Sequence, residues 1–284
     1  MSLWGYKGQS HHSHQTGGRG EISIKRCREC GLGFSGPYPS EHIVHELYDI
    51  NSGDTNCEPI GNTFIDKLKN VAARRQVRDM IPAADRRSAE AVLDYGTGNS
   101  RFALVCSELF PQAEVHALDY QEQVPCALLD RGPRIRYVQH DEWRRTNRKY
   151  DLILLRHVLE HNHDPVGLLR RLAQRLTPTG RLYLEVPNLD SWFVGKLGHL
   201  VNTPYVPFHI WHFSRAPLQQ IIQDCGMRCR MGYSEMLLMG SSLAMLLGQQ
   251  KNLLHQVAGV ALHRAQLVLS AIFGAPCVTA VCWR

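Results

Sequence analysis

Apolar and polar residues follow a repeating pattern through the middle of the chain, in which short apolar runs alternate with stretches of helical spacing. Five of the apolar runs have the length of β-strands: residues 91–95, 114–119, 134–139, 150–155 and 181–186. Strands that alternate with helices are typical of a parallel sheet with crossover helices. The pattern therefore predicts an α/β fold, with a doubly wound and mostly parallel sheet that carries helices on both faces.

The helices of this pattern have recognisable ends. Residues 64–81 have apolar side chains at roughly helical spacing before a proline, and residues 101–110 have the same spacing after the first strand. Asp164 is a favourable N-cap and Pro165 a favourable first helical residue. They predict a helix over residues 166–176 that stops in the Thr-Pro-Thr-Gly sequence that follows.

The last third of the chain predicts further strands and a helical insert. Ser214 is a favourable N-cap for a helix through Gln223, and residues 227–233 and 277–283 have strand character. A helical insert is predicted at about residues 236–273, and its second half is apolar on most sides. Burial in the fold or in a homodimer is the preferred interpretation, and peripheral contact with a membrane surface is the alternative.

The N-terminal region differs in composition from the rest. Residues 1–20 contain clustered histidines and glycines without a periodic apolar pattern, so we expect a flexible tail. Residues 21–60 predict a small cysteine-containing module, and within it we expect residues 21–40 to form a compact knuckle instead of a strand or helix. Residues 61–284 then form the main domain.

Composition and charge exclude several classes of protein. The 284 residues are 44% hydrophobic, enough to bury a full core, and the net charge of +6 is spread along the chain, so no nucleic-acid partner is expected. No apolar stretch is long enough for a transmembrane segment, and the N-terminus lacks the apolar core of a signal peptide. A cytoplasmic protein is predicted, with its nine cysteines reduced.

A glycine-rich turn follows the first predicted strand and opens a helix. Asp94 ends this strand, Gly96 and Gly98 lie in the turn, and Asp119 ends the next strand. Glycines let a ligand approach the backbone, and an acid at the second strand end can accept the hydroxyls of a ribose. A plain tight connection and an exposed aspartate are the alternatives to a nucleotide-type site.

Four further motifs follow the glycine turn along the chain. They are His-Val-Leu-Glu-His at 157–161, Leu-Thr-Pro-Thr-Gly-Arg-Leu at 176–182, Pro-Asn at 187–188 and His-Ile-Trp-His-Phe-Ser at 209–214. With the glycine turn, they make the chain resemble the class I S-adenosylmethionine-dependent methyltransferases, over residues 27–233 and the last strand. The resemblance implies a Rossmann-like seven-stranded sheet whose last strand is antiparallel, with S-adenosyl-L-methionine as the cofactor.

The resemblance also implies a set of cofactor-binding residues. They are Asp94, Gly96, Thr97, Gly98, Asp119, Tyr120, Asp141 and Arg156. The turn would hold the methionine part, Asp119 the ribose and Asp141 the adenine, although Asp141 also fits a polar turn that caps a helix. Ser100 departs from the family, where many members have a third glycine, and we expect it to act as an N-cap.

Methyl transfer to a hydroxyl needs a group that takes up its proton, and histidine suits this task. The candidates are His209, then His157, followed by His161 and His212. For any one of them, a packed or capping role is the common alternative. We predict O-methylation of a small-molecule, sugar, glycan or lipid-linked acceptor; N- or C-methylation, or a non-catalytic binding protein with this fold, are the alternatives.

Cys27 and Cys30 form a Cys-x-x-Cys pair that resembles half of a zinc knuckle found in some members of the family. Structural zinc usually has four ligands. His11 and His14 could complete the site, and Cys57, His42 and His45 are other possible partners. A metal-free, degenerate knuckle is an equal alternative.

Overall fold

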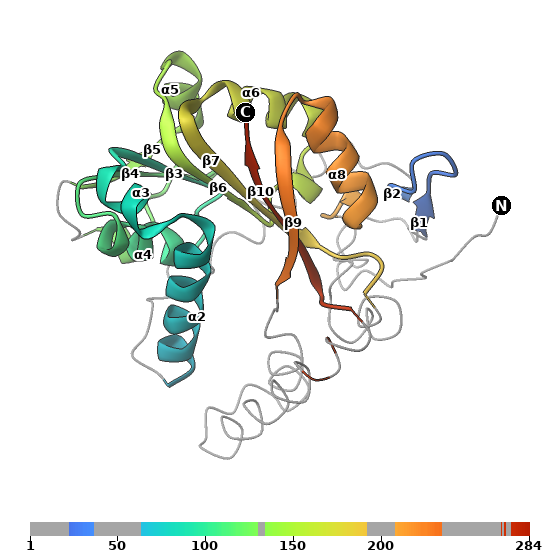
Figure 1. Ribbon diagram of the computed structural model, residues 1–284, viewed down its shortest axis with the longest axis horizontal. Helices are drawn as coiled ribbons and strands as arrows, with labels where there is room; N and C mark the ends of the chain where they lie inside the picture. The colour runs from blue at the N-terminus through green and yellow to red at the C-terminus, as the bar shows by residue number, and fades with distance from the viewer. Residues whose placement is uncertain are drawn as a thin grey trace.

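The computed structural model describes residues 23–36, 64–129, 134–191, 208–234, 268, 270 and 274–284. Its centre is a seven-stranded sheet of order β5-β4-β3-β6-β7-β10-β9 (Figure 1). The strands are β3 (Ala91–Tyr95), β4 (Glu114–Leu118), β5 (Ile135–Val138), β6 (Tyr150–Arg156), β7 (Leu176–Pro187), β9 (Arg228–Ser234) and β10 (Cys277–Trp283). β10 is antiparallel to both of its neighbours, and the strands from β5 to β7 are parallel. The predicted fold class is confirmed, including the inserted antiparallel strand.

Helices cover both faces of this sheet. α2 (Phe64–Met80) and α4 (Arg101–Leu109) pack on one face, and α5 (His140–Arg145), α6 (Pro165–Gln174) and α8 (Arg215–Asp224) pack on the other. The short helix α3 (Ala83–Ser88) leads from α2 into β3, and two 3₁₀ turns, η1 (Cys126–Leu128) and η2 (Leu159–His161), follow β4 and β6. In the described part of the chain, no helix has both the length and the apolar character needed to cross a membrane.

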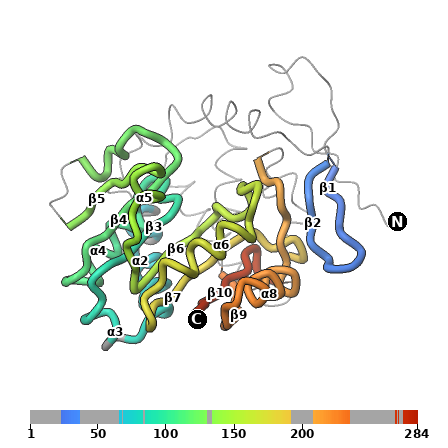
Figure 2. Tube along the Cα trace, turned by 90° about the horizontal axis from the view of Figure 1, so that it is seen from above, coloured from blue at the N-terminus to red at the C-terminus, as the bar shows by residue number. Residues whose placement is uncertain are grey.

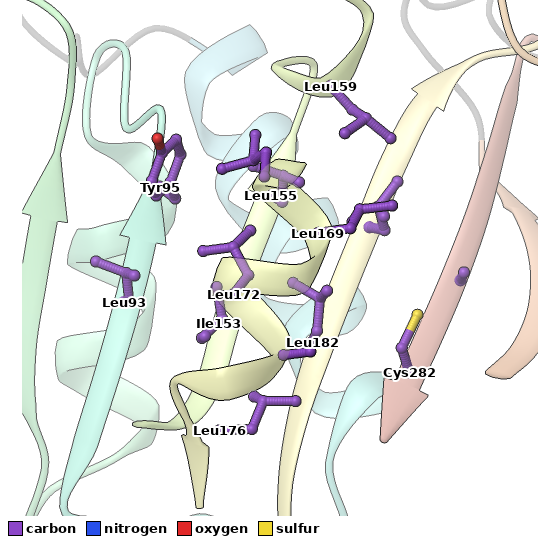
Figure 3. Close-up of a cluster of buried hydrophobic side chains, with 14 of the residues drawn as sticks. Leu93, Tyr95, Ile153, Leu155, Leu159, Leu169, Leu172, Leu176, Leu182 and Cys282 are labelled. Carbon is purple, nitrogen blue, oxygen red and sulfur yellow. The ribbon is translucent and has the colours of Figure 1, made fainter. Parts of the chain in front are cut away.

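The core consists of two layers because successive strand residues point to opposite faces. On one face Leu93 and Ile153 lie against Leu169 and Leu172 of α6 (Figure 3). On the other, Val92 and its neighbours in β4 and β6 pack against α2 and α4. Burial on both faces explains why these strands are continuous apolar runs.

The segment predicted as a knuckle is a β-hairpin, so the expectation of a structure without strands was wrong. β1 (Ser23–Arg26) pairs with β2 (Gly33–Gly36), and β2 also pairs with β8 (Trp211–His212). Figures 1 and 2 both place this hairpin beside α8, far from α4. Its strands have only four residues each and no clear alternation of apolar residues, so the sequence carries little strand signal here.

The predicted stop of α6 was also wrong in detail. The helix ends at Gln174, and the Thr-Pro-Thr-Gly sequence lies within β7. Leu176 pairs with Tyr150, whereas Arg181 already pairs with Leu152, so the residues between form an irregularity in the strand. Leu176 is fully buried, and the Tyr150 N–H donates to the Arg175 carbonyl at 2.8 Å, so pairing with β6 begins directly after the helix.

Several predicted features lie outside the described residues. They are the tail at 1–20, most of the module at 21–60, and nearly all of the helical insert at 236–273.

Candidate functional site

The glycine turn after β3 lies at the carboxyl end of the sheet. The N–H groups of Gly96 and Thr97 both donate to the Leu118 carbonyl, at 2.7 and 2.9 Å. Gly96 has φ +80°, and a Cβ atom there would lie 2.2 Å from Cγ2 of Val158. Gly98 has φ +50°, and nothing lies within 4 Å of its added Cβ. Gly96 therefore serves close packing onto the segment after β6, whereas Gly98 leaves open space beside the backbone.

Asp94 stabilises the glycine turn through a hydrogen bond with Thr97. Its side chain is only 3% exposed, and Oδ2 accepts a hydrogen bond of 2.7 Å from the Thr97 hydroxyl. Burial raises its pKa to about 6, against the hydrogen bond from Thr97 and the positive charge of Arg156. Asp94 and Thr97 thus fix the shape of the glycine turn.

Asp119 follows β4 and lies directly beside this turn. Its Oδ2 accepts a hydrogen bond of 2.7 Å from the Gly98 N–H, and its Oδ1 accepts one of 2.7 Å from the Tyr120 N–H. The carboxylate is partly exposed, and the Tyr120 side chain is 52% exposed. Two backbone donors therefore orient an accessible carboxylate over the open side of Gly98.

Asp141 is exposed in the first turn of α5, immediately after β5. It lies at the same edge of the sheet as Asp119, because β4 and β5 are parallel. Between them, the ring of His140 contacts Tyr95 edge-on at 5.3 Å and Tyr120 at 6.3 Å between centroids. The family resemblance places the adenine beside Asp141, and this edge of the sheet is lined with aromatic rings.

Ser100 does not cap α4 with its side chain, so that expectation was wrong. It has a left-handed backbone with φ +62°, and it makes no side-chain capping bond. The hydroxyl is buried and has no hydrogen-bond partner among the described residues. Serine therefore occupies a conformation that favours glycine.

Glu185 is buried near the end of β7 and pairs with the partly buried Arg156 at the end of β6. Arg156 Nη2 lies 3.0 Å from Glu185 Oε1, and the guanidinium stacks on the Phe102 ring at 3.6 Å from its centroid. Glu185 also accepts hydrogen bonds from Tyr183 and from Gln76 of α2. Its pKa is lowered, because Arg156 and its other partners outweigh the effect of burial. Arg156 thus links the edge of the glycine turn to β7.

His157 bridges two glutamates. Its Nδ1 lies 3.4 Å from Glu160 Oε1, and its Nε2 lies 3.1 Å from Glu185 Oε1. Burial lowers its pKa, but the contacts with both glutamates outweigh burial and raise it to about 9. The residue also has a left-handed backbone, with φ +52°. Both ring nitrogens are therefore engaged inside the protein.

His161 and His209 meet above Glu160. Their rings are edge-to-face with centroids 4.6 Å apart, and His209 Nε2 lies 3.9 Å from Glu160 Oε1. His161 Nδ1 is 2.9 Å from the Phe208 carbonyl, and Ile210 N–H donates to the Glu160 carbonyl at 2.9 Å. These bonds fasten the segment before β8 to η2.

His212 is held by the hairpin instead. Its Nε2 is 2.9 Å from the Ser35 hydroxyl of β2, and that hydroxyl donates to the His209 carbonyl at 2.7 Å. Burial lowers the pKa of His212 to about 4. The structure thus gathers three of the four predicted histidines around Glu160 and uses the fourth to join β8 to β2.

Cys27 and Cys30 lie in the turn of the β1–β2 hairpin as free thiols. The pKa of Cys27 is lowered, chiefly by a hydrogen bond from the Cys30 backbone N–H. Among the described residues, no third histidine, cysteine or carboxylate joins them in a potential metal-binding group. His11 and His14 lie outside the described residues, so a zinc site here stays a prediction.

Sequence reasoning gave no role to Glu160 or Glu185. Glu160 lies inside the motif at 157–161, and Glu185 is the single charged residue in the run Leu-Tyr-Leu-Glu-Val at 182–186. An acidic residue in an otherwise apolar strand signals a buried partner. That signal was available from the sequence, but the identity of the partners was not.

Comparison with known proteins gives a consistent result. Residues 68–230 match the profile of the methyltransferase domain family. No curated protein sequence matches the chain. Among solved structures, phosphoethanolamine N-methyltransferase 2 of Haemonchus contortus, in complex with S-adenosyl-L-methionine, has a TM-score of 0.58 at 15% identity, covering 94% of this chain and 70% of that chain.

Two further solved structures have similar folds. Human N-acetylserotonin methyltransferase, in complex with SAM, has a TM-score of 0.53 at 16% identity, covering 87% of this chain and 60% of that chain. The mitomycin 7-O-methyltransferase has a TM-score of 0.51 at 17% identity and covers 78% of this chain. The chain spans 55% of the length of that enzyme. At these identities the likeness shows a shared fold.

Proposed function

The chain belongs to the methyltransferase domain family, and from this premise we propose that it transfers a methyl group from S-adenosyl-L-methionine to an oxygen of a small-molecule, sugar or lipid-linked acceptor. The observation that carries the proposal is the Asp119 carboxylate. Two backbone N–H groups orient it beside Gly98, where the structure is open. A partly exposed carboxylate with fixed geometry suits the two hydroxyls of a ribose.

The residues of the turn fit the rest of this cofactor. Gly98 lets a ligand approach the backbone, and Asp94 and Thr97 keep the turn in shape. Asp141 and Tyr120 lie at the adjoining edge, where an adenine would be held. When bound, S-adenosyl-L-methionine supplies a methyl group on a sulfonium, which an aligned nucleophile can take up.

The second part of the site suits an acceptor that must lose a proton. Val158 packs against Gly96, so the segment with Glu160 and His161 begins next to the glycine turn. His157 has both nitrogens engaged by glutamates, and His212 faces Ser35. We therefore assign the removal of the acceptor's proton to the cluster that contains His209, in keeping with a hydroxyl as the acceptor group.

The proposal is tested by calorimetric titration with S-adenosyl-L-methionine and with S-adenosylhomocysteine. The wild-type chain should bind both, and Asp119→Ala should weaken binding by roughly 1.5 to 3 kcal/mol, the range for losing hydrogen bonds to a charged group. Asp79→Ala is a matched control, because its carboxylate is exposed on α2 and its contact with Arg75 is long at 3.9 Å. No binding to the wild type, or equal affinity in Asp119→Ala, would contradict the proposal.

A further inference from the structure

Glu160 is a buried carboxylate that the described protein leaves without hydrogen bonds. The side chain is 1% exposed, and neither oxygen accepts a hydrogen bond from any residue in the described part of the chain. The nearest basic atoms are His157 Nδ1 at 3.4 Å and His209 Nε2 at 3.9 Å. Burying a carboxylate in this state is costly unless a positive charge completes its surroundings.

Two imidazoles converge on the same point. Donor atoms of Glu160, His161 and His209 all lie within 4.8 Å of one another. Because a carbonyl only accepts, His161 Nδ1 must donate to Phe208, and this leaves the lone pair on Nε2. Histidines that bind metal ions characteristically donate their other nitrogen to a carbonyl or carboxylate in this way.

We propose that Glu160, His161 and His209 bind a divalent first-row transition metal ion, with Zn²⁺ as the first candidate. Two imidazoles and one carboxylate are a donor set of catalytic zinc sites, in which a further position is open to water or substrate. Hydrogen bonds between η2 and the segment before β8 hold the three residues together without the ion. The ion would give Glu160 a directly bonded partner, whereas His157 lies 3.4 Å away and is shared with Glu185.

A second group of potential ligands contains a carboxylate that already has partners within the protein. His157, Glu185 and Cys277 also converge, but Glu185 already has Arg156, Tyr183 and His157 as partners. Its charge is compensated inside the protein, and it needs no ion. The contrast singles out the Glu160 group.

The metal site deepens the proposed function, and its part in the reaction rests on that function. A hydroxyl bound at the open position has its pKa lowered by the ion, so that its proton passes to solvent water. His209 then aids proton loss as a ligand of the ion, not as the base itself. Binding of the metal, by contrast, is independent of methyl transfer and is tested by itself.

The experiment measures Zn²⁺ binding after removal of metal by a chelator. Titration calorimetry and elemental analysis are applied to the full chain with His11→Gln, His12→Gln and His14→Gln, and with Cys27→Ser and Cys30→Ser, so that other candidate ligands are absent. The wild-type chain is measured alongside. One Zn²⁺ per chain is expected in this background.

The variants then locate the ion. Glu160→Gln and His209→Gln should each weaken binding by more than about 100-fold, since even the outer partners of ligands change metal affinity by about 10- to 100-fold. His116→Gln is the matched control, because this buried histidine of β4 contacts Tyr150 and Glu114 outside the cluster; it should bind Zn²⁺ normally. Circular dichroism checks that each variant is folded.

Two outcomes would overturn the proposal. One is the absence of Zn²⁺ binding in the background chain, and the other is binding that survives both Glu160→Gln and His209→Gln. The Co²⁺ spectrum gives an independent measurement, since a site of nitrogen and oxygen ligands lacks thiolate charge-transfer bands. Titration with S-adenosyl-L-methionine separates the two proposals: Zn²⁺ binding without cofactor binding would contradict the proposed function alone.

Discussion

At the scale of single residues, three positions in the turn after β3 have left-handed backbones, and only two of them are glycines. Gly96, Gly98 and Ser100 have φ values of +80°, +50° and +62°. This conformation costs a residue with a Cβ atom about 1 to 2 kcal/mol. Ser100 bears that cost and also buries a hydroxyl without a partner among the described residues. The geometry of the turn therefore dictates the conformation, against the preference of the residue.

Replacing Ser100 by glycine should stabilise the protein. Ser100→Gly removes the strained Cβ and the buried hydroxyl, and the larger conformational entropy of glycine in the unfolded chain offsets part of this gain. We expect the free energy of unfolding to rise by about 1 kcal/mol, as measured by urea denaturation. Ser100→Ala separates the two causes, since it removes the hydroxyl but keeps the strain. A loss of stability in Ser100→Gly would show that the hydroxyl has a stabilising partner.

At the scale of elements, the sequence predicted best where local periodicity and packing agree. The strand predicted at 91–95 and that predicted at 277–283 match β3 and β10. At β2 and at the start of β7 the prediction was wrong, because these strands depend on pairing with distant parts of the chain. β2 is a strand because it pairs with β1 and with β8, nearly 180 residues away. β7 begins at Leu176, which pairs with Tyr150 of β6. Neither partner is visible in a local window of sequence.

The pairing of β8 with β2 should depend on pH through His212. Its pKa is about 4 in the folded protein, below its ordinary value of 6.5, because it is buried. A lowered pKa means that the unfolded chain binds the proton more tightly, so stability is complete above about pH 6.5 and falls as the pH drops toward 4. Compared with His212→Gln, the wild type should lose up to about 3 kcal/mol of stability over this range.

Urea denaturation of both proteins between pH 7.5 and 4 measures this difference. Hydrogen exchange adds a local measurement, because the Ser35 N–H donates to the Ile210 carbonyl at 2.9 Å. Its protection should fall on acidification in the wild type. Parallel pH curves for the two proteins would mean that His212 stays accessible to solvent protons.

At the scale of the whole molecule, the candidate site lies where the order of strands changes direction. In the sheet β3 lies between β4 and β6, so the strands that come after β3 in the chain are added first on one side of it and then on the other. Ligands of open α/β sheets bind at the carboxyl ends of the strands at such a point. Strand ends are readable from the sequence, so Asp94, Gly98 and Asp119 could be placed there. Glu160 and Glu185 could not be given roles, because only the fold brings His209 to Glu160 and Arg156 to Glu185.

Glu185 connects three parts of the molecule. Arg156 Nη2 and His157 Nε2 lie 3.0 and 3.1 Å from its Oε1, Tyr183 donates to its Oε2 at 2.7 Å, and Gln76 reaches it from α2. Glu185→Gln removes the charge but keeps the size of the side chain. It leaves the partly buried Arg156 without its counter-ion, and breaking a fully buried pair in this way costs about 3 to 5 kcal/mol, which is the upper bound here.

We expect the free energy of unfolding of Glu185→Gln to fall by up to this amount near pH 7, in urea denaturation. Because the pKa of Glu185 is lowered in the folded state, its contribution is complete above the pKa of an ordinary glutamate and is lost as the pH falls below it. The difference between wild type and variant should therefore shrink below about pH 4.5. Adding Arg156→Met should restore part of the stability, because the unpaired charge is then gone. A double variant no more stable than Glu185→Gln would show that Tyr183 and Gln76, and not the ion pair, make Glu185 important to the fold.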